Sequence, residues 1–337
     1  MESVVKSIKK QSLEKLYSGL LSEYKIYAPV CADEKTTGYT YNPPFSEVTF
    51  EHVRSNLSVK NLVFPKVETL FSFTNSKTEN EIQEPDLQNI PNVILFGSHP
   101  CDNSAFEILK SIFCWDITDK FFAERLEKLT VIGLSCHKSD EYCFCSSAGL
   151  SPDCKKGSDI LLTKLKNGDY KAEICTEKGM AIVNKFPDLF AAANNDDVEA
   201  VAPVAKKFSH EQLAGKLEGL FDNPFWVENS LRCLGCGACA YVCPTCACFD
   251  MQDETKGKTG KRYRSWDSCG FGLFTLHTSG HNPRSVQSQR WRQRIMHKFS
   301  YMPDRNKSLG CVGCGRCSSA CPVDMNIAEQ LEALQNI

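Results

Sequence analysis

The sequence predicts a protein in two parts: an α/β domain over residues 1–186 and a smaller, cysteine-rich domain over residues 230–337, joined by a helical linker over residues 187–229. Two observations lead to this division. In the first part, continuous apolar runs alternate with helical patterns, which is typical of a sheet covered by helices. In the second part, one cysteine motif occurs twice, on either side of a long insertion over residues 249–310.

The N-terminal segments are predicted in chain order from their apolar spacing. Residues 4–24 predict an amphipathic helix, and an extended segment follows because it contains a proline. Short strands are expected at residues 47–50 and 62–64. The charged, turn-rich segment 75–89 predicts a surface loop.

Two buried strands are expected next, over residues 92–97 and 130–136, because each run is continuously apolar. Helical patterns lie between these two strands, at residues 103–113 and 121–129. A hairpin is predicted around Asn167 and Gly168, with strands over residues 159–165 and 170–175. Strand, helix, strand and hairpin together predict an α/β domain.

The linker is expected to be mostly helical, with helices over residues 198–208 and 210–220. No glycine-rich G-x-G-x-x-G turn follows a strand in the sequence, and no Walker motif is present. The sequence therefore predicts no dinucleotide site in this chain.

The repeated motif is C-x2-C-x2-C-x3-C-P. Its cysteines are Cys233, Cys236, Cys239 and Cys243 in the first run, and Cys311, Cys314, Cys317 and Cys321 in the second. This is the spacing of bacterial ferredoxins. Neither a zinc site nor a disulfide framework calls for three evenly spaced cysteines and a Cys-Pro pair, twice. The motif therefore predicts two [4Fe–4S] clusters.

The doubled motif also predicts how the ligands are shared. In two-cluster ferredoxins, the last cysteine of each run binds the other cluster. Cluster I is expected to use Cys233, Cys236, Cys239 and Cys321, and cluster II to use Cys311, Cys314, Cys317 and Cys243. The runs must then meet in space although 67 residues lie between Cys243 and Cys311. The second part is thus predicted to be a two-cluster ferredoxin domain with an insertion, which suits a relay of single electrons.

A possible third cluster involves four cysteines of the first domain. Cys101 and Cys136 follow the two predicted buried strands, and Cys143 and Cys145 lie in the next loop. Ligands sit at the C-terminal ends of strands in open α/β sheets. The alternative is that these are small buried residues, since a free cysteine packs like a small hydrophobe. The polar surroundings of Cys143 and Cys145 favour ligation, with Cys154 and Cys175 as spare candidates.

Five other cysteines have no motif of their own. Cys246, Cys248 and Cys269 are expected either to line the cluster pocket or to supply one ligand in place of Cys321. Cys31 and Cys114 are expected to be structural.

Composition narrows the class of protein. The net charge is −2, and each cluster would add about two negative charges, which argues against a nucleic-acid partner. No apolar run approaches the ~20 residues of a membrane span, and the first residues lack a signal-peptide pattern. Nineteen cysteines without a secretion signal indicate metal ligands rather than disulfides. We expect a cytoplasmic protein in a reducing, anaerobic setting.

The insertion contains a basic segment over residues 285–298, which includes Trp291. Two interpretations are open. The segment is either a solvated basic helix, or a docking element that packs on the ferredoxin domain and meets a partner, because arginine and tryptophan anchor many interfaces.

Short motifs along nearly the whole chain point to a known family. They are Tyr27-Ala-Pro-Val, Gly97-Ser-His-Pro-Cys-Asp, Gly133-Leu-Ser-Cys, Glu141-Tyr-Cys-Phe-Cys, Cys243-Pro-Thr-Cys-Ala-Cys, Trp266-Asp-Ser-Cys and Gly280-His-Asn, besides the two ferredoxin runs. With them the chain resembles the β subunits of cytoplasmic [NiFe] hydrogenases (sulfhydrogenases), and it is similar to the A subunit of anaerobic sulfite reductase. The motifs of Cys101, Cys136, Cys143 and Cys145 belong to this resemblance, which therefore implies the third [4Fe–4S] cluster.

The resemblance implies an electron-transfer subunit without catalytic residues of its own. Its implied partners are a γ-type subunit that binds FAD and NAD(P)H, and a catalytic subunit. The catalytic subunit is a hydrogenase, a sulfite reductase or a heterodisulfide-reductase-like flavoprotein of a bifurcating complex. Two alternatives remain: a self-contained iron–sulfur reductase, and a cluster-bearing scaffold or redox sensor. The missing nucleotide motif favours the relay, because a reductase needs an entry for two-electron donors.

Overall fold

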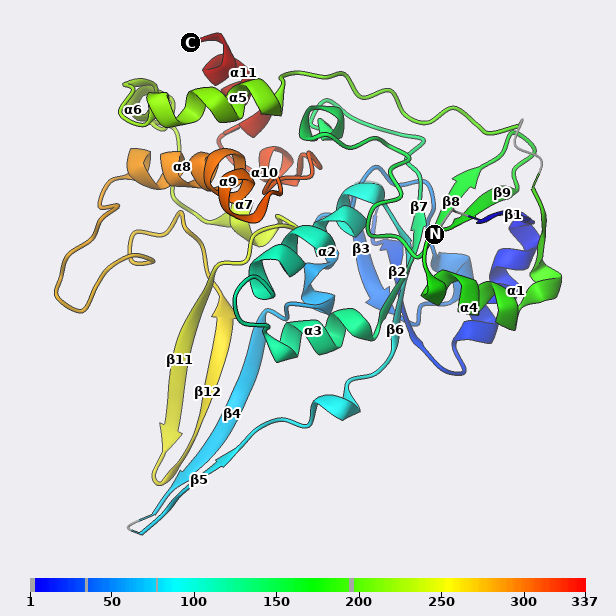
Figure 1. The fold of residues 1–337 in the computed structure, drawn as a ribbon, viewed down its shortest axis with the longest axis horizontal. Helices are drawn as coiled ribbons and strands as arrows, with labels where there is room; N and C mark the ends of the chain where they lie inside the picture. Colours follow the sequence, from blue (N-terminus) through cyan, green and yellow to red (C-terminus); the bar gives the residue numbers. More distant parts are fainter. Residues whose placement is uncertain (1–3, 34–35, 77, 194–196) are drawn as a thin grey trace.

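The computed structural model describes residues 4–33, 36–76, 78–193 and 197–337 (Figure 1). The protein has a large mixed sheet flanked by helices, a narrow antiparallel arm, and a helical layer that contains the C-terminus. The fold is therefore of the mixed α/β kind, as predicted.

The large sheet has eight strands in the order β10-β1-β9-β8-β7-β6-β2-β3. Its strands are β1 (Val4–Ile8), β2 (Lys25–Cys31), β3 (Thr37–Tyr41), β6 (Val93–Ser98), β7 (Leu129–Leu134), β8 (Ile160–Lys164), β9 (Tyr170–Ile174) and β10 (Phe190–Ala192). The central strands β2, β6, β7 and β8 are parallel to their neighbours within this set. The antiparallel strands lie toward the edges.

Helices cover both faces of this sheet, and strand periodicity decides which residues meet them. The helices are α1 (Lys10–Leu20), α2 (Pro100–Phe113), α3 (Lys120–Glu127) and α4 (Glu177–Lys185). Ile94 and Phe96 of β6 pack in the core on the side of α1 and α4. Leu95, between them, packs with residues of α2 and α3. Both faces of β6 are therefore buried, which explains its continuous apolar run.

The predicted strands and helices around β6 and β7 are confirmed, as are the β8–β9 hairpin and the helix that begins at residue 210. Five other predictions were wrong. Residues 4–8 form a strand because they pair with β9 and β10. Short 3-10 helices, Phe45–Glu47 and Val59–Leu62, lie where two strands were expected.

The other two wrong predictions concern a loop and a helix. The predicted surface loop 75–89 contains β5 (Asn80–Gln83), which pairs with β4 (Val67–Asn75). Residues 198–208 contain no helix, because their backbone bonds to the sheet domain instead. Glu199 N donates to Lys164 O at 2.9 Å, and Ala202 N donates to Cys136 O at 2.8 Å.

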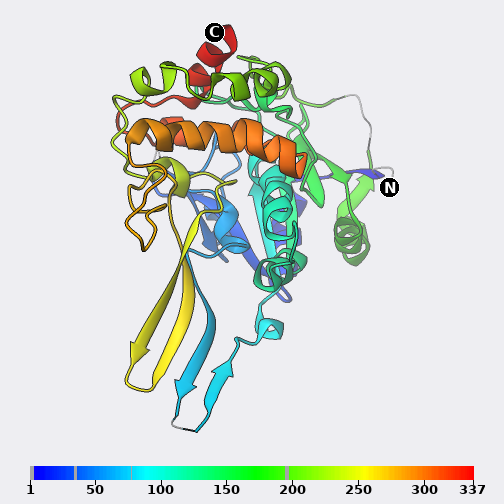
Figure 2. The same cartoon turned by 60° about the vertical axis from the view of Figure 1, so that its left-hand side comes forward.

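The arm is a second sheet with the order β11-β12-β4-β5. It joins segments from both halves of the chain, because β11 (Phe249–Lys256) and β12 (Thr259–Trp266) come from the insertion. Figures 1 and 2 show the arm extending away from the rest of the protein. Every residue of β11 is exposed, and β4 and β12 bury residues only at the base of the arm, so the arm has no continuous buried face that a sequence pattern could reveal.

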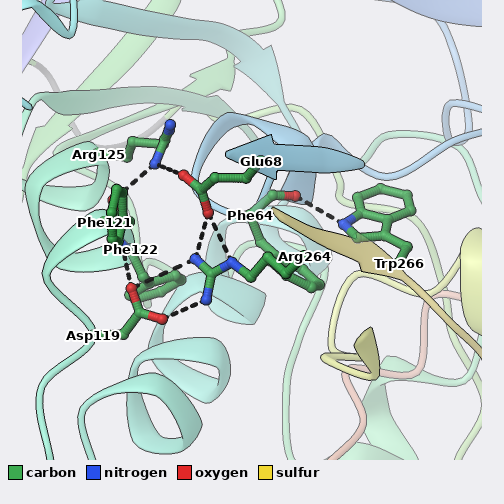
Figure 3. A network of polar contacts seen from close by, with 8 residues as sticks. All are labelled: Phe64, Glu68, Asp119, Phe121, Phe122, Arg125, Arg264 and Trp266. Atoms are coloured by element: carbon green, nitrogen blue, oxygen red, sulfur yellow. Dashed lines mark hydrogen bonds and ion pairs between the residues drawn. The ribbon is translucent and has the colours of Figure 1, made fainter. Parts of the chain in front are cut away.

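A buried ion-pair network fastens the base of the arm to the α/β domain (Figure 3). Arg264 of β12 bonds to Glu68 of β4, with 2.7 Å between Nε and Oε2, and it also pairs with Asp119 at the start of α3. Arg125 of α3 pairs with the same Glu68. The side chains of Arg264 and Glu68 are each 3% exposed. Removing one partner therefore leaves charges buried without compensation.

Replacing Arg264 with methionine is expected to lower the free energy of unfolding by about 3 kcal/mol, because Glu68 and Asp119 lose their shared cation. Denaturant melts of the holo-protein measure this loss. The control is Arg262→Met on the same strand, because the ion pair of Arg262 with Asp253 is 44% exposed on both sides and its loss should change stability far less. Equal effects of the two variants would show that the buried network does not hold the arm.

The helical layer is built from α5 (His210–Leu217), α6 (Phe225–Glu228), α8 (Gln287–Met296), α9 (Met302–Asn306) and α11 (Ile327–Asn336). Figures 1 and 2 place α8 between the sheets and α5. Leu213, Trp226, Trp291 and Leu331 share one apolar core. Trp291 is only 4% exposed, so it packs on this core and cannot be the surface anchor of the docking interpretation.

Candidate iron–sulfur sites

Each ferredoxin run forms a tight loop that leads into a short helix, α7 (Ala238–Tyr241) or α10 (Arg316–Ser319). Gly237 and Gly315 precede these helices, and each has a φ of 75°. A Cβ added to Gly237 would lie 2.5 Å from a ring carbon of Phe271, and one added to Gly315 would lie 2.4 Å from the carbonyl oxygen of Tyr142. Only glycine fits both the left-handed backbone and these close approaches.

The first candidate site, site I, is a cavity at the first run. Its cysteines are Cys233, Cys236, Cys239, Cys269, Cys317 and Cys321. Two donors already point at its sulfurs. Gln287 Nε2 lies 3.1 Å from Cys233 Sγ, and Met325 N lies 3.3 Å from Cys321 Sγ.

The second candidate site, site II, is a cavity at the second run. Its cysteines are Cys243, Cys311, Cys314 and Cys317. Gly313 N lies 3.4 Å from Cys311 Sγ, so a backbone donor faces a sulfur here as well. Arg294 lines both site I and site II, and Lys298 lines site II.

The structure therefore brings each run's first three cysteines together with the last cysteine of the other run. Cys321 lies at site I, and Cys243 lies at site II. This is the grouping that an exchange of ligands needs. Cys269 also lines site I, so it is the competitor for the place of Cys321, and ligation by Cys321 stays a prediction.

The third candidate site, site III, lies at the C-terminal ends of β6 and β7, two adjacent parallel strands. Its cysteines are Cys101, Cys136, Cys143 and Cys145, and they line one cavity together with Arg54, Gly313 and Cys314. Cys101 is in the first turn of α2, and Cys136 follows β7. Cys154 and Cys175 do not line this cavity.

The thiols of site III lie in an environment that keeps them protonated while no metal is bound. Burial raises the pKa of Cys136 and of Cys145 to about 12, and it raises the pKa of Cys101 well above its ordinary value. Arg54 Nη1 lies 3.7 Å from Cys143 Sγ, and the Arg54 guanidinium pairs with Asp140 at 2.6 Å. Iron binding would displace these protons, as it does at thiolate sites generally.

Sites II and III share a wall. Cys314 lines both cavities. Phe144 N donates to Gly313 O at 2.9 Å, which joins the Cys143–Cys145 loop to the second ferredoxin run. A Cβ on Gly313 would lie 2.5 Å from the Cα of Cys145, so the two loops pack backbone to backbone. In the same way, Cys317 lines both site I and site II.

The remaining cysteines divide into two kinds. Cys246 is buried beside Cys243, and Cys248 is partly buried. Cys114 packs against the core next to α2. Cys31 was expected to be structural, but it is exposed and lines an open cavity, so that expectation was wrong.

Several residues around these sites were not identified from the sequence as site residues. Arg54 contacts the sulfur of Cys143 and Gln287 contacts the sulfur of Cys233, but neither residue lies in a cysteine motif. Arg294 and Lys298 were noted only as part of a basic segment, although both are 4% exposed. One signal could have indicated this burial. Arg294 on α8 and Lys298 in the π-helical segment directly after it are spaced so that they lie on the same side as buried Trp291 and Ile295.

The donor set fits iron–sulfur clusters. At least four cysteines line each of the three cavities, glycine turns bring backbone N–H groups to the sulfurs, and none of the described residues that line sites I and II is a carboxylate. These are the features of [4Fe–4S] sites. The described residues contain no group of three or more His, Cys, Asp or Glu that could hold a single metal ion. No described helix is long and apolar enough to span a membrane.

The fold and sites define a dicluster iron–sulfur protein, and the comparisons agree. Residues 232–325 match the family of 4Fe-4S dicluster domains. The β subunit of sulfhydrogenase 2 from Pyrococcus furiosus is 29% identical to this chain over 320 residues, which are 92% of each protein. The resemblance to hydrogenase β subunits is thereby confirmed.

A second relative shares less of the chain. The β subunit of F420-dependent formate dehydrogenase from Methanocaldococcus jannaschii is 25% identical over 179 residues, which are 48% of this chain and 38% of that protein. No solved structure matches the chain.

Proposed function

We propose that this chain is an iron–sulfur subunit that relays single electrons between an FAD- and NAD(P)H-binding γ-type subunit and a catalytic oxidoreductase subunit. The observation that carries this proposal is the series of shared walls, with Cys317 between sites I and II and Cys314 between sites II and III. Both relatives are β subunits of oxidoreductases, a hydrogenase and a formate dehydrogenase. A bound [4Fe–4S] cluster supplies a one-electron redox couple.

The residues of this chain have three tasks in such a relay. The predicted ligands hold clusters at sites I and II, and Cys101, Cys136, Cys143 and Cys145 hold the third. Gln287, Arg54 and the backbone N–H groups donate toward sulfurs, which stabilises thiolate ligands. Phe144, which is 1% exposed, lines site II and excludes water between the second ferredoxin run and the loop of site III.

Site I is the place where a partner subunit would reach the relay. Cys236 is exposed, and Leu234, beside it in the cavity wall, is 66% exposed. Leu231 and Leu273, in the two segments that flank the site, are 79% and 77% exposed. Exposed apolar side chains gathered at a redox site are typical of an interface that is covered in a complex.

The test is NAD(P)H-dependent dye reduction by the anaerobically prepared holo-protein. The chain alone should show none, since its sequence predicts no nucleotide site, and adding the co-purifying flavin subunit should restore it. Replacing Leu234 and Leu273 together with aspartate should lower this restored rate at least tenfold and weaken co-purification. The control is Ile117→Asp, at an 84% exposed position in the α/β domain, which should leave both unchanged.

The alternative function, a self-contained iron–sulfur reductase, is favoured by one observation. An open cavity of about 700 Å³ lies between the two halves of the chain and is lined by Arg54, Asp140, Tyr142 and Arg316 among others. Its volume is that of a small-molecule site. Dye reduction by the chain alone would support this function and contradict the relay.

A further inference from the structure

Two of the buried cations near the cysteines of sites I and II, Arg294 and Lys298, face sulfur atoms, whereas a third, Lys60, donates to the carbonyls of Ala240 and Cys246. Arg294 Nη1 is 3.4 Å from Cys246 Sγ, and its Nη2 donates to Cys239 O at 2.9 Å. Lys298 Nζ is 3.5 Å from Cys243 Sγ and donates to Thr245 Oγ1 at 2.8 Å and Gly310 O at 2.7 Å. Each side chain is thus held in place by carbonyl and hydroxyl oxygens while its charge faces sulfur.

Within the described part of the chain, neither Arg294 nor Lys298 has a carboxylate to balance its charge. Arg294 and Lys298 form no ion pair with any described residue, and Arg294 Nε is a buried donor without a partner among the same residues. The charge of these two residues is therefore available to whatever sites I and II hold.

Site III differs in this respect, because its cations are already paired. Arg54 pairs with Asp140 at 2.6 Å, and Arg316, which is close to Cys101 and Cys314, pairs with buried Asp102 at 2.5 Å. A cation next to a carboxylate presents little net field to a third group. Sites I and II therefore have different electrostatic surroundings from site III.

This difference in charge affects how easily each cluster is reduced. Adding an electron to a cluster adds one negative charge, and a fixed positive charge nearby stabilises that reduced state strongly where the dielectric constant is low. The cost of burying the cation was met during folding, so the protein does not have to rearrange when the electron arrives.

We propose that Arg294 and Lys298 are positioning residues that hold the clusters of sites I and II at higher reduction potentials than the cluster of site III, so that electrons collect on the ferredoxin pair. This rests on the proposed function in one respect, the existence of the third cluster. Site III is then the low-potential end of the relay: only a strongly reducing donor can reduce it, and its electron then passes to the higher-potential clusters of sites I and II.

The experiment is a redox titration of the holo-protein followed by electron paramagnetic resonance, with iron content measured on the same samples. Lys298→Met removes the charge and keeps the stem. At a fixed poise, we expect the ratio of reduced to oxidised cluster II to fall at least tenfold, which is about 59 mV for a one-electron couple. Cluster III should titrate as in the parent. Lys298→Arg should restore the parent potential, and Lys307→Met, at an exposed lysine, should change nothing.

Arg294→Gln is the second variant, because it keeps a donor for Cys239 O without the charge. It should lower the reduced fraction of both clusters I and II. Unchanged potentials at full iron content would overturn the proposal, and so would an equal shift at cluster III. Iron loss in both variants would also overturn it, because the residues would then only support the ligands. A parent iron content of about eight atoms would remove the third cluster from the proposed function, while the shift at cluster II would still be measurable.

Discussion

Replacing Cys143 and Cys145 together with serine is expected to lower the iron content of the anaerobically reconstituted protein from about twelve to about eight atoms per chain. The physical reason is that these two residues are half of the four cysteines predicted to bind the third cluster. Among the described residues, the one further cysteine that lines the cavity is Cys314 of the ferredoxin run, which is a predicted ligand of site II. Iron and sulfide analysis of variant and parent gives the result.

The control pair is Cys154→Ser with Cys175→Ser. Both residues are partly buried cysteines of the same domain, but neither lines site III, so the iron content should stay at the parent value. If the parent binds about eight atoms and the Cys143/Cys145 variant binds the same number, the third cluster does not exist and these cysteines only pack.

Replacing Cys321 with alanine is expected to damage the cluster held by Cys233, Cys236 and Cys239, and to leave the second-run cluster intact. Cys321 lies in the second run but lines site I, and Met325 N donates toward its sulfur at 3.3 Å. Removing the fourth ligand should cost about four iron atoms, or convert the cube to a smaller cluster. Electron paramagnetic resonance spectra of the reduced variant identify which cluster is lost.

Cys269→Ala is the matched variant, because Cys269 lines the same cavity and is the alternative fourth ligand. If Cys321 is the ligand, Cys269→Ala should retain both ferredoxin clusters. The reverse result, with cluster I lost only in Cys269→Ala, would move the ligand to the Trp266-Asp-Ser-Cys segment. Loss of only the second-run cluster in Cys321→Ala would mean that each run closes on itself.

The sequence was informative where local spacing determines structure. Three cysteines at intervals of three residues, with glycines between them, specify a loop around a cluster without help from distant residues. Continuous apolar runs predicted β6 and β7, because a strand buried on both faces has no polar side. From these strands followed the placing of Cys101 and Cys136 at neighbouring strand ends, which the structure confirms.

The wrong predictions lie where partners far along the chain decide the local structure. Residues 4–8 have spacing compatible with a helix, yet they form a strand because β9 and β10 offer backbone donors and acceptors on both sides. The arm has no continuous apolar alternation, since it is buried only at its base, and its strands come from segments almost 200 residues apart. Long-range pairing of this kind leaves no periodic signal in either segment.

By itself, then, the sequence determined where the cysteine motifs lie, and it predicted which residues hold clusters and that the two runs exchange their last ligands, because ligand spacing and glycine turns are local properties. Only the tertiary structure decided the order of the three sites, with Cys317 and Cys314 as their shared walls. It also decided the charges: Arg294 and Lys298 read as surface residues in a basic segment, but α8 turns them inward among the sulfurs. Burial and the absence of a nearby carboxylate depend on how distant segments pack, and they set the strength of a charge through the local dielectric.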